Sequence, residues 1–220
     1  MPSTLAFIHS SHVLIPVFSA LAQRELPETK TFHVADESLI RNTIGAGCLT
    51  KQTTRQVISL IGSAREAGAD AVLVTCSSIG PAVSIARHIF EFPILRIDEA
   101  MAEKAVCSAS RIGVAATVKT TLDPTLALLR EKAAELHRSI EMVECLCTGA
   151  FERVIVGDTD THDRIVSEAL TELGKKVDLI VLAQASMARV VEKVAPQALT
   201  VPVLSSPELA IQQAKQILSQ

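Results

Sequence analysis

The stretch TCSSIG at residues 75–80 places a thiol and two hydroxyls directly after a run of apolar residues. The segment 71–75 is typical of a buried strand, and the residues from 80 onward are typical of a helix. Cys76 therefore follows a strand and precedes a helix, where we expect the helix dipole to lower the pKa of a thiol. A thiolate at such a place can take a proton from carbon or act as a nucleophile. A small buried side chain is the alternative, and for Cys76 the position alone leaves both open.

The other cysteines fit the structural alternative better. The chain has five cysteines, an odd number, and their spacing matches no metal finger. The segment CLC at 145–147 lies in a strand-like stretch, where alternate side chains share a face, so we expect two buried thiols rather than a metal pair. The six histidines are scattered, without the spacing of a zinc site. We therefore expect chemistry that uses no metal.

Small hydroxyl residues follow most of the predicted strands, where helices begin. Each one alone is explained by helix capping. As a set, hydroxyls and free backbone N–H groups at helix starts form a site suited to a small anion such as a carboxylate. No glycine-rich phosphate loop or dinucleotide motif accompanies them, which favours a small acid over a nucleotide. The candidate hydroxyl residues are Ser10, Ser11, Ser77, Ser78, Thr117, Thr120, Thr121 and Ser186.

The elements that must position these groups follow an alternating pattern. Short runs rich in Val, Ile and Leu alternate with longer amphipathic stretches, which predicts an α/β fold of parallel sheets covered by helices on both faces. The expected strands are 4–8, 31–34, 71–75, 93–97, 111–116, 140–146, 178–183 and 201–204. The expected helices are 12–25, 50–67, 80–90, 99–108, 123–137, 159–174, 186–195 and 207–219.

An internal repeat indicates two similar halves. GADAVLVTCSSIG, a helix and FPILRIDEAMAEKAV are echoed by KVDLIVLAQASMA, a helix and VPVLSSPELAIQQAK. A gapless alignment on Asp70 and Asp178 puts Cys76 opposite Gln184. We expect two α/β lobes related by a pseudo-twofold, residues 1–98 with 206–220 and residues 99–205, facing each other across a cleft. Because ligands sit at the carboxyl ends of parallel strands, we expect both repeated turns to line the site.

These motifs resemble the aspartate/glutamate/hydantoin racemase superfamily, whose two half-domains carry a CNT-like and an LGCT-like turn. TCSSIG resembles the first turn and VLAQASMA occupies the place of the second, while GVAATVKTTLDP resembles the threonine-rich loop between them. FIHSSH stands where that family has its first substrate loop, so the resemblance covers nearly the whole chain. It implies an enzyme without metal or cofactor in which two cysteines exchange protons with the carbon beside a carboxylate.

The resemblance also implies functions for individual residues. Cys76 would be one acid/base, with Ser77 and Ser78 as substrate contacts. The residues Thr117, Thr120 and Thr121 would bind carboxylate, Ser10 and Ser11 would close the pocket, and Ser186 would contribute from the other lobe.

The second catalytic cysteine is where this chain departs from the pattern. Gln184 stands in its place, or Ala185 if the register slips by one, and neither side chain delivers a proton as a thiol does. Glutamine can donate a hydrogen bond to a carboxylate or an enolate oxygen. The missing thiol therefore suggests a changed reaction.

Three functions stay open. The first is a cofactor-independent racemase-like isomerase acting on a small carboxylic acid or amino-acid derivative; a true racemase would need another second acid, such as His9 or Glu37. The second is a decarboxylase, lyase or cis–trans isomerase that needs only one thiol. The third is a non-catalytic small-acid binding protein, which would tolerate Cys76→Ser.

Bulk composition narrows the choice of partners and compartment. Hydrophobic residues make up 48% and charged residues 20%, as in an ordinary soluble globular protein. The net charge of −3, without a basic stripe and without Trp or Tyr, argues against nucleic-acid binding. No apolar run reaches the ~18 residues of a membrane span, and the first residues do not read as a signal peptide. We expect a cytoplasmic protein with no membrane segment, and the resemblance implies a homo-oligomer.

Overall fold

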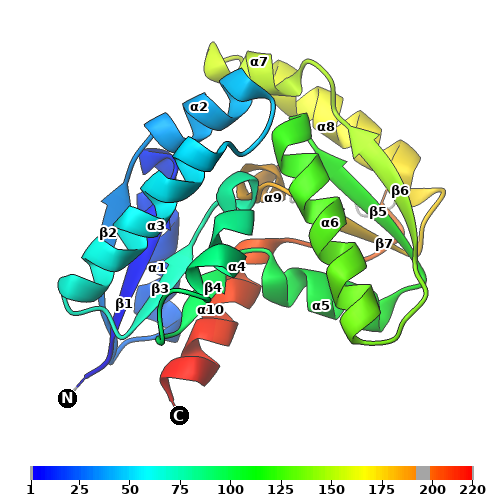
Figure 1. Cartoon of the computed structure of the whole chain (residues 1–220). Helices are drawn as coiled ribbons and strands as arrows, with labels where there is room; N and C mark the ends of the chain where they lie inside the picture. Colours follow the sequence, from blue (N-terminus) through cyan, green and yellow to red (C-terminus); the bar gives the residue numbers. More distant parts are fainter. Residues whose placement is uncertain (1, 192–198, 220) are drawn as a thin grey trace. The chain divides into compact units, whose positions relative to one another are not determined.

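The computed structural model describes residues 2–191 and 199–219. The chain divides into two compact units, residues 1–100 with 207–220 and residues 101–206. Each unit contains a parallel sheet of four strands (Figure 1). The predicted α/β fold with two similar lobes is confirmed.

The first unit has the strand order β2-β1-β3-β4. Its strands are β1 (Thr4–His9), β2 (Lys30–Ala35), β3 (Ala71–Val74) and β4 (Ile94–Arg96). Its helices are η1 (His12–Leu14), α1 (Ile15–Glu25), α2 (Ser38–Ala46), α3 (Lys51–Glu66), η2 (Ser77–Ile79), α4 (Pro81–Ala86) and α10 (Ser206–Leu218), where η denotes a 3-10 helix.

Sheet residues of the first unit are buried on both faces. Along β1, Leu5 and Phe7 belong to one hydrophobic cluster and Ala6 and Ile8 to another, because successive side chains of a strand point to opposite faces. Helices α1 and α10 supply the first cluster, and α2, α3 and α4 supply the second. This two-sided burial explains why the strands read as continuous apolar runs.

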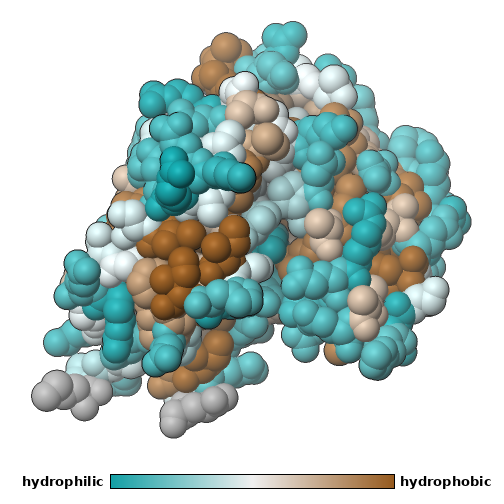
Figure 2. All heavy atoms as spheres, viewed as in Figure 1, coloured by the Kyte–Doolittle hydropathy of each residue, from teal (hydrophilic) through white to brown (hydrophobic). Residues whose placement is uncertain are grey.

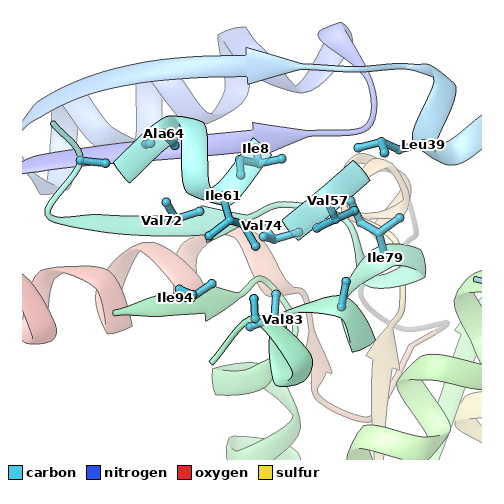
Figure 3. Packing of buried hydrophobic residues seen from close by; sticks show 14 residues of the cluster. Ile8, Leu39, Val57, Ile61, Ala64, Val72, Val74, Ile79, Val83 and Ile94 are labelled. Atoms are coloured by element: carbon cyan, nitrogen blue, oxygen red, sulfur yellow. The ribbon is translucent and has the colours of Figure 1, made fainter. Parts of the chain in front are cut away.

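Figure 3 shows the second of these clusters from close by. Val57 and Ile61 of α3 point toward Val72 and Val74 of β3, and all four side chains are fully buried. Helix α3 presents this face because its apolar residues recur at helical spacing. The packing fixes β3, and with it the residues that follow β3.

The second unit has the equivalent strand order β6-β5-β7-β8. Its strands are β5 (Arg111–Ala116), β6 (Glu141–Leu146), β7 (Leu179–Leu182) and β8 (Val203–Leu204). Its helices are α5 (Glu99–Ser108), α6 (Lys119–Glu135), α7 (Ala150–Ile155), α8 (Thr159–Gly174), η3 (Ala185–Met187) and α9 (Ala188–Val191).

Helix α8 packs on one face of this second sheet. Val166, Leu170 and Leu173 of α8 share a buried cluster with Ile180 and Leu182 of β7. Helix α6 packs against β5 and β6. Both units therefore build their cores from the same elements in the same order along the chain.

Most predicted boundaries agree with the structure to within a few residues, and the differences have local causes. Helix α6 begins at Lys119 rather than 123 and accommodates Pro124 in its interior. Helix α4 ends at Ala86, although turns continue through the following residues. The predicted helix 186–195 begins as η3 and α9, and its part from 192 onward lies outside the described residues.

Helices α2 and α7 were not expected from the sequence pattern. Helix α2 buries only Leu39 and Thr43, and α7 buries only Ala150. Such short helices carry too few apolar positions to show a helical period.

The face of the molecule in Figure 2 is mostly hydrophilic, and hydrophobic residues form separate patches on it. Ile85 and Ile89 are among the exposed large hydrophobic residues of the first unit. In the part of the chain that the structure describes, no helix combines the length and the apolarity that a membrane span requires.

Candidate functional site

Cys76 lies directly after β3, at the carboxyl end of the strand, and is the residue that precedes η2. Its thiol receives hydrogen bonds from the Ser10 hydroxyl, the backbone N–H groups of Ser78 and Ile79, and the Ser78 hydroxyl. Ser10 follows β1, the strand that pairs with β3. The two adjacent strand ends therefore bring Ser10 to Cys76 across 66 residues of sequence.

Burial raises the pKa of the Cys76 thiol, and the hydrogen bonds to its sulfur offset this effect only in part. The N–H groups at the start of the following helix lower this pKa, but burial outweighs them, so the expected net lowering of the pKa is wrong. The physical reason is that burial disfavours the charged thiolate more than these hydrogen bonds favour it. At neutral pH Cys76 is a protonated thiol that can donate its proton.

Gln184 occupies the equivalent place in the second unit, directly after β7 and before η3. Its Oε1 accepts hydrogen bonds from the backbone N–H of Thr117 at 2.6 Å and from the Thr117 hydroxyl at 3.0 Å. Thr117 follows β5, as Ser10 follows β1. The pair Thr117 and Gln184 is thus the counterpart of Ser10 and Cys76.

Further hydrogen bonds repeat between the units. The Asp70 carboxylate accepts from the Thr4 N–H at 2.8 Å, and the Asp178 carboxylate accepts from the Arg111 N–H at 2.9 Å. The Ile79 N–H donates to the carbonyl of Cys76, as the Met187 N–H donates to the carbonyl of Gln184. These equivalences support the gapless alignment of Cys76 with Gln184.

The threonines of the second unit gather at the start of α6. Thr120 and Thr121 lie in its first turn, Thr117 lies two residues before the helix begins, and all three threonines are buried. Within the described part of the chain, Thr120 Oγ1 is buried without a hydrogen-bond partner. A buried hydroxyl without a partner is unfavourable, so an oxygen of a bound ligand would satisfy it.

The remaining predicted serines have separate places. Ser77 and Ser78 form the first two residues of η2 and are buried beside Cys76. Ser11 precedes η1, and Ser186 lies in η3 of the second unit. The structure therefore brings Ser10, Ser77 and Ser78 together with Cys76.

Sequence reasoning missed a hydrogen-bond chain in the first unit that runs from the buried Thr75 to the exposed Ser19. Thr75 gives its hydroxyl proton to the carbonyl of Ile8, so it accepts from Nδ1–H of His9 at 2.8 Å. His9 Nε2 must then accept from Nδ1–H of His33 at 2.9 Å, and His33 Nε2 accepts from the Ser19 hydroxyl at 3.0 Å. The sequence did contain a signal for it, because His9 alternates with Leu5 and Phe7 along β1 and therefore points to the same buried face.

The imidazoles of His9 and His33 in this hydrogen-bond chain are both neutral at neutral pH. Burial, together with the neighbouring His33, lowers the pKa of His9 to about 4, and burial also lowers the pKa of His33. Both ring nitrogens of His9 are occupied by Thr75 and His33. His9 therefore does not fit the second acid that a racemase would need.

Glu37 is an equally poor proton donor. It forms an exposed pair with His12, and the hydrogen bond from that imidazole lowers the pKa of the Glu37 carboxyl. The side chain is a charged carboxylate at neutral pH, so it has no proton to give.

A buried ion pair supports the loop that follows Cys76. Arg96, at the end of β4, donates two hydrogen bonds of 3.0 Å to Asp98, and both side chains are buried. A Cβ atom added at Gly80 would lie 2.8 Å from Arg96 Nε. The guanidinium therefore packs directly against the backbone that links η2 to α4.

Among the described residues, no cluster of three or more His, Cys, Asp or Glu side chains could hold a metal ion. In the first unit the groups around Cys76 are hydroxyls and backbone N–H groups, and in the second unit the carboxamide of Gln184 lies beside Thr117. Such groups bind a small anion and move a proton.

Comparison with known families matches residues 8–214 to the Asp/Glu/Hydantoin racemase family. The chain belongs to this family. No match is found among curated protein sequences.

Solved structures share the fold. Glutamate racemase isoform RacE1 from Bacillus anthracis has 20% identity and a TM-score of 0.74, over 99% of this chain and 82% of its own. Allantoin racemase from Klebsiella pneumoniae has 19% identity and a TM-score of 0.72, over 99% of this chain and 88% of its own. The Picrophilus torridus aspartate racemase has 13% identity and a TM-score of 0.74, over 99% of this chain and 94% of its own.

Proposed function

We propose that this chain is a cofactor-independent enzyme of the racemase family that moves a proton at the carbon beside a carboxylate. Its substrate is a small carboxylic acid or amino-acid derivative, and Cys76 is the acid/base. The observation that carries this proposal is the Cys76 thiol, held at the end of β3 by the Ser10 hydroxyl and the N–H groups of η2.

Because Cys76 is protonated at neutral pH, its first role in the proposed reaction is that of a proton donor. Because burial raises its pKa, the resting thiol carries the proton that a carbanion or enolate would receive. In giving up that proton, the sulfur becomes a thiolate, which the donors from Ser10, Ser78 and Ile79 stabilise. A proton from solvent then restores the thiol.

Substrate binding is assigned to the hydroxyl residues. In the first unit Ser77 and Ser78 contact the substrate beside Cys76, with Ser10 and Ser11 closing the pocket. In the second unit Thr120, Thr121 and Ser186 bind a carboxylate, for which the unpartnered hydroxyl of Thr120 is the main support.

Gln184 favours a second candidate within this proposal, a one-thiol reaction such as decarboxylation, elimination or cis–trans isomerisation. Racemisation through two faces of a carbon needs a second acid/base. Gln184 stands at the equivalent strand end, and its Oε1 is occupied by Thr117. A one-thiol reaction needs Cys76 alone.

The test is turnover in deuterated water with Cys76→Ser and, as a matched control, Cys107→Ser, which removes an exposed cysteine. The substrates are both enantiomers of aspartate and glutamate, the hydantoin allantoin, and small unsaturated and substituted dicarboxylates. NMR follows deuterium at the carbon beside the carboxylate, and chiral chromatography follows configuration. Cys76→Ser is expected to lose about 10²–10⁴-fold in rate, the usual share of a general acid.

The outcomes distinguish a racemase, a one-thiol enzyme and a binding protein. Exchange from both enantiomers identifies a racemase, and deuterium in one product of a single configuration identifies a one-thiol reaction. Binding without turnover, unchanged by Cys76→Ser, would overturn the enzyme proposal in favour of a small-acid binding protein. Turnover that survives Cys76→Ser would remove Cys76 as the acid/base.

A further inference from the structure

Two cysteines of the second unit lie together at the end of β6, Cys145 within the strand and Cys147 directly after it. Cys145 is paired with Ala115 in register, and the Cys147 N–H donates to the carbonyl of Ala116 at 2.8 Å. Because alternate residues of a strand share a face, both side chains point toward the cluster that α8 covers. The Cys147 thiol forms a hydrogen bond with Cys145.

The two thiols differ in their surroundings. Cys145 is partly exposed, whereas Cys147 is 2% exposed and buried in the cluster. The hydrogen bond from Cys147, assisted by the charge of Lys176, lowers the pKa of Cys145 to about 7. The same interaction, together with burial, raises the pKa of Cys147. Of the two thiols, the more exposed Cys145 therefore ionises first, and the buried Cys147 stays protonated behind it.

We propose that Cys145 and Cys147 are a dithiol pair that a hydroperoxide oxidises to a disulfide at the end of β6. The Cys145 thiolate attacks the outer oxygen of the hydroperoxide, an S–O bond forms and the O–O bond breaks. Cys145 becomes a sulfenic acid, and the other oxygen takes up a proton from solvent and leaves as water or an alcohol. The sulfur of Cys147 then attacks the Cys145 sulfur. The S–O bond breaks, and the hydroxyl leaves as water with the proton of Cys147.

The backbone geometry allows this closure. Residues two apart in a strand have Cα atoms about 6.6 Å apart, from a rise of about 3.3 Å per residue. Disulfides span Cα separations of roughly 4.4–6.8 Å, so the pair lies near the upper limit. The chain leaves β6 at Cys147, where the Thr148 N–H turns back to the carbonyl of Leu146 at 2.9 Å. A small change in this turn brings the two sulfurs together.

The proposal does not depend on Cys76 or on the reaction assigned to it. The test therefore uses a Cys76→Ser background, which removes the other buried thiol near a strand end. Hydrogen peroxide is added in near-stoichiometric amount, free thiols are alkylated, and tryptic peptides are analysed by mass spectrometry. The peptide 139–153 contains Cys145 and Cys147 and no other cysteine.

The expected result is loss of two hydrogen atoms from this peptide, while Cys48 and Cys107 remain open to alkylation. Both of these cysteines are exposed, so they control for access. Addition of Cys147→Ser should leave a Cys145 sulfenic acid that dimedone traps, and Cys145→Ser should leave the peptide unoxidised. Oxidation of Cys48 or Cys107 at the same rate as Cys145, or sulfonic acid without the disulfide, would overturn the proposal.

Discussion

Cys76 and Gln184 hold equivalent positions after β3 and β7, yet their surroundings give them opposite properties. The donors from Ser10 and η2 stabilise a negative charge on the Cys76 sulfur once its proton has left. The Gln184 carboxamide is fixed by Thr117, its counterpart of Ser10. The duplicated strand and turn therefore carries a hydrogen-bonded thiol in one unit and, in the other, a carboxamide that is hydrogen-bonded to Thr117.

At the same scale, His9 makes stability depend on pH. Its pKa of about 4 in the folded protein lies below 6.5, so between these values the unfolded chain binds a proton that the folded protein does not. This stabilising contribution is present above pH 6.5 and is lost as pH falls toward 4. We expect the free energy of unfolding, measured with urea, to fall by about 2 kcal/mol between pH 7 and pH 5 from His9 alone.

The matching variants are His9→Gln and His88→Gln, the second at an exposed histidine. His9→Gln removes the titrating ring, so the free energy of unfolding should fall less between pH 7 and pH 5. The same change lowers the free energy of unfolding at pH 7, because it breaks the hydrogen bonds to Thr75 and His33. In His88→Gln the free energy of unfolding should fall between pH 7 and pH 5 by as much as in the native protein. An equal pH dependence in His9→Gln would contradict this explanation.

At the scale of elements, the turn between η2 and α4 depends on Gly80. Its backbone is ordinary helical, with φ −52° and ψ −38°, so the requirement for glycine is steric. A Cβ atom would meet the Arg96 guanidinium, which is held by Asp98 and cannot move away cheaply. Gly80→Ala should lower the free energy of unfolding by about 1–3 kcal/mol, the usual cost of overpacking.

Gly45→Ala is the matched control, because a Cβ atom at Gly45 in α2 meets no atom within 4 Å. That change should raise stability by about 0.5–1 kcal/mol, as expected for alanine in a helix. Thermal and urea unfolding measure both variants. A neutral Gly80→Ala would show that Arg96 does not constrain this turn.

The sequence predicts individual elements well, but it does not predict which distant residues these elements bring into contact. Strand β5 and helix α8 match their predicted ranges because their apolar residues keep a clear period between capping and turn residues. The contact of Ser10 with Cys76 and the chain from Thr75 to Ser19 join residues far apart in sequence. Only the order of strands in the sheet brings them together, and a local pattern carries no information on it.

For the whole molecule, the repeat seen in the sequence corresponds to two units with the same strand order. Equivalent hydrogen bonds at Asp70 and Asp178 show that the repeat extends to individual side chains. The alignment therefore predicted where Gln184 lies. It did not predict the pKa of Cys76, because burial depends on the packing of the complete unit rather than on the turn alone.

The central claim is that Cys76 is a protonated thiol at neutral pH and donates its proton. The most direct measurement is thiolate formation against pH by ultraviolet absorbance, taken as the difference between the native protein and Cys76→Ser. We predict a midpoint above the ordinary cysteine value of about 8.5, and a further rise in Ser10→Ala, because the Ser10 hydrogen bond favours the thiolate. A midpoint near or below pH 7 would contradict the claim, since Cys76 would then be a resting thiolate and act first as a base.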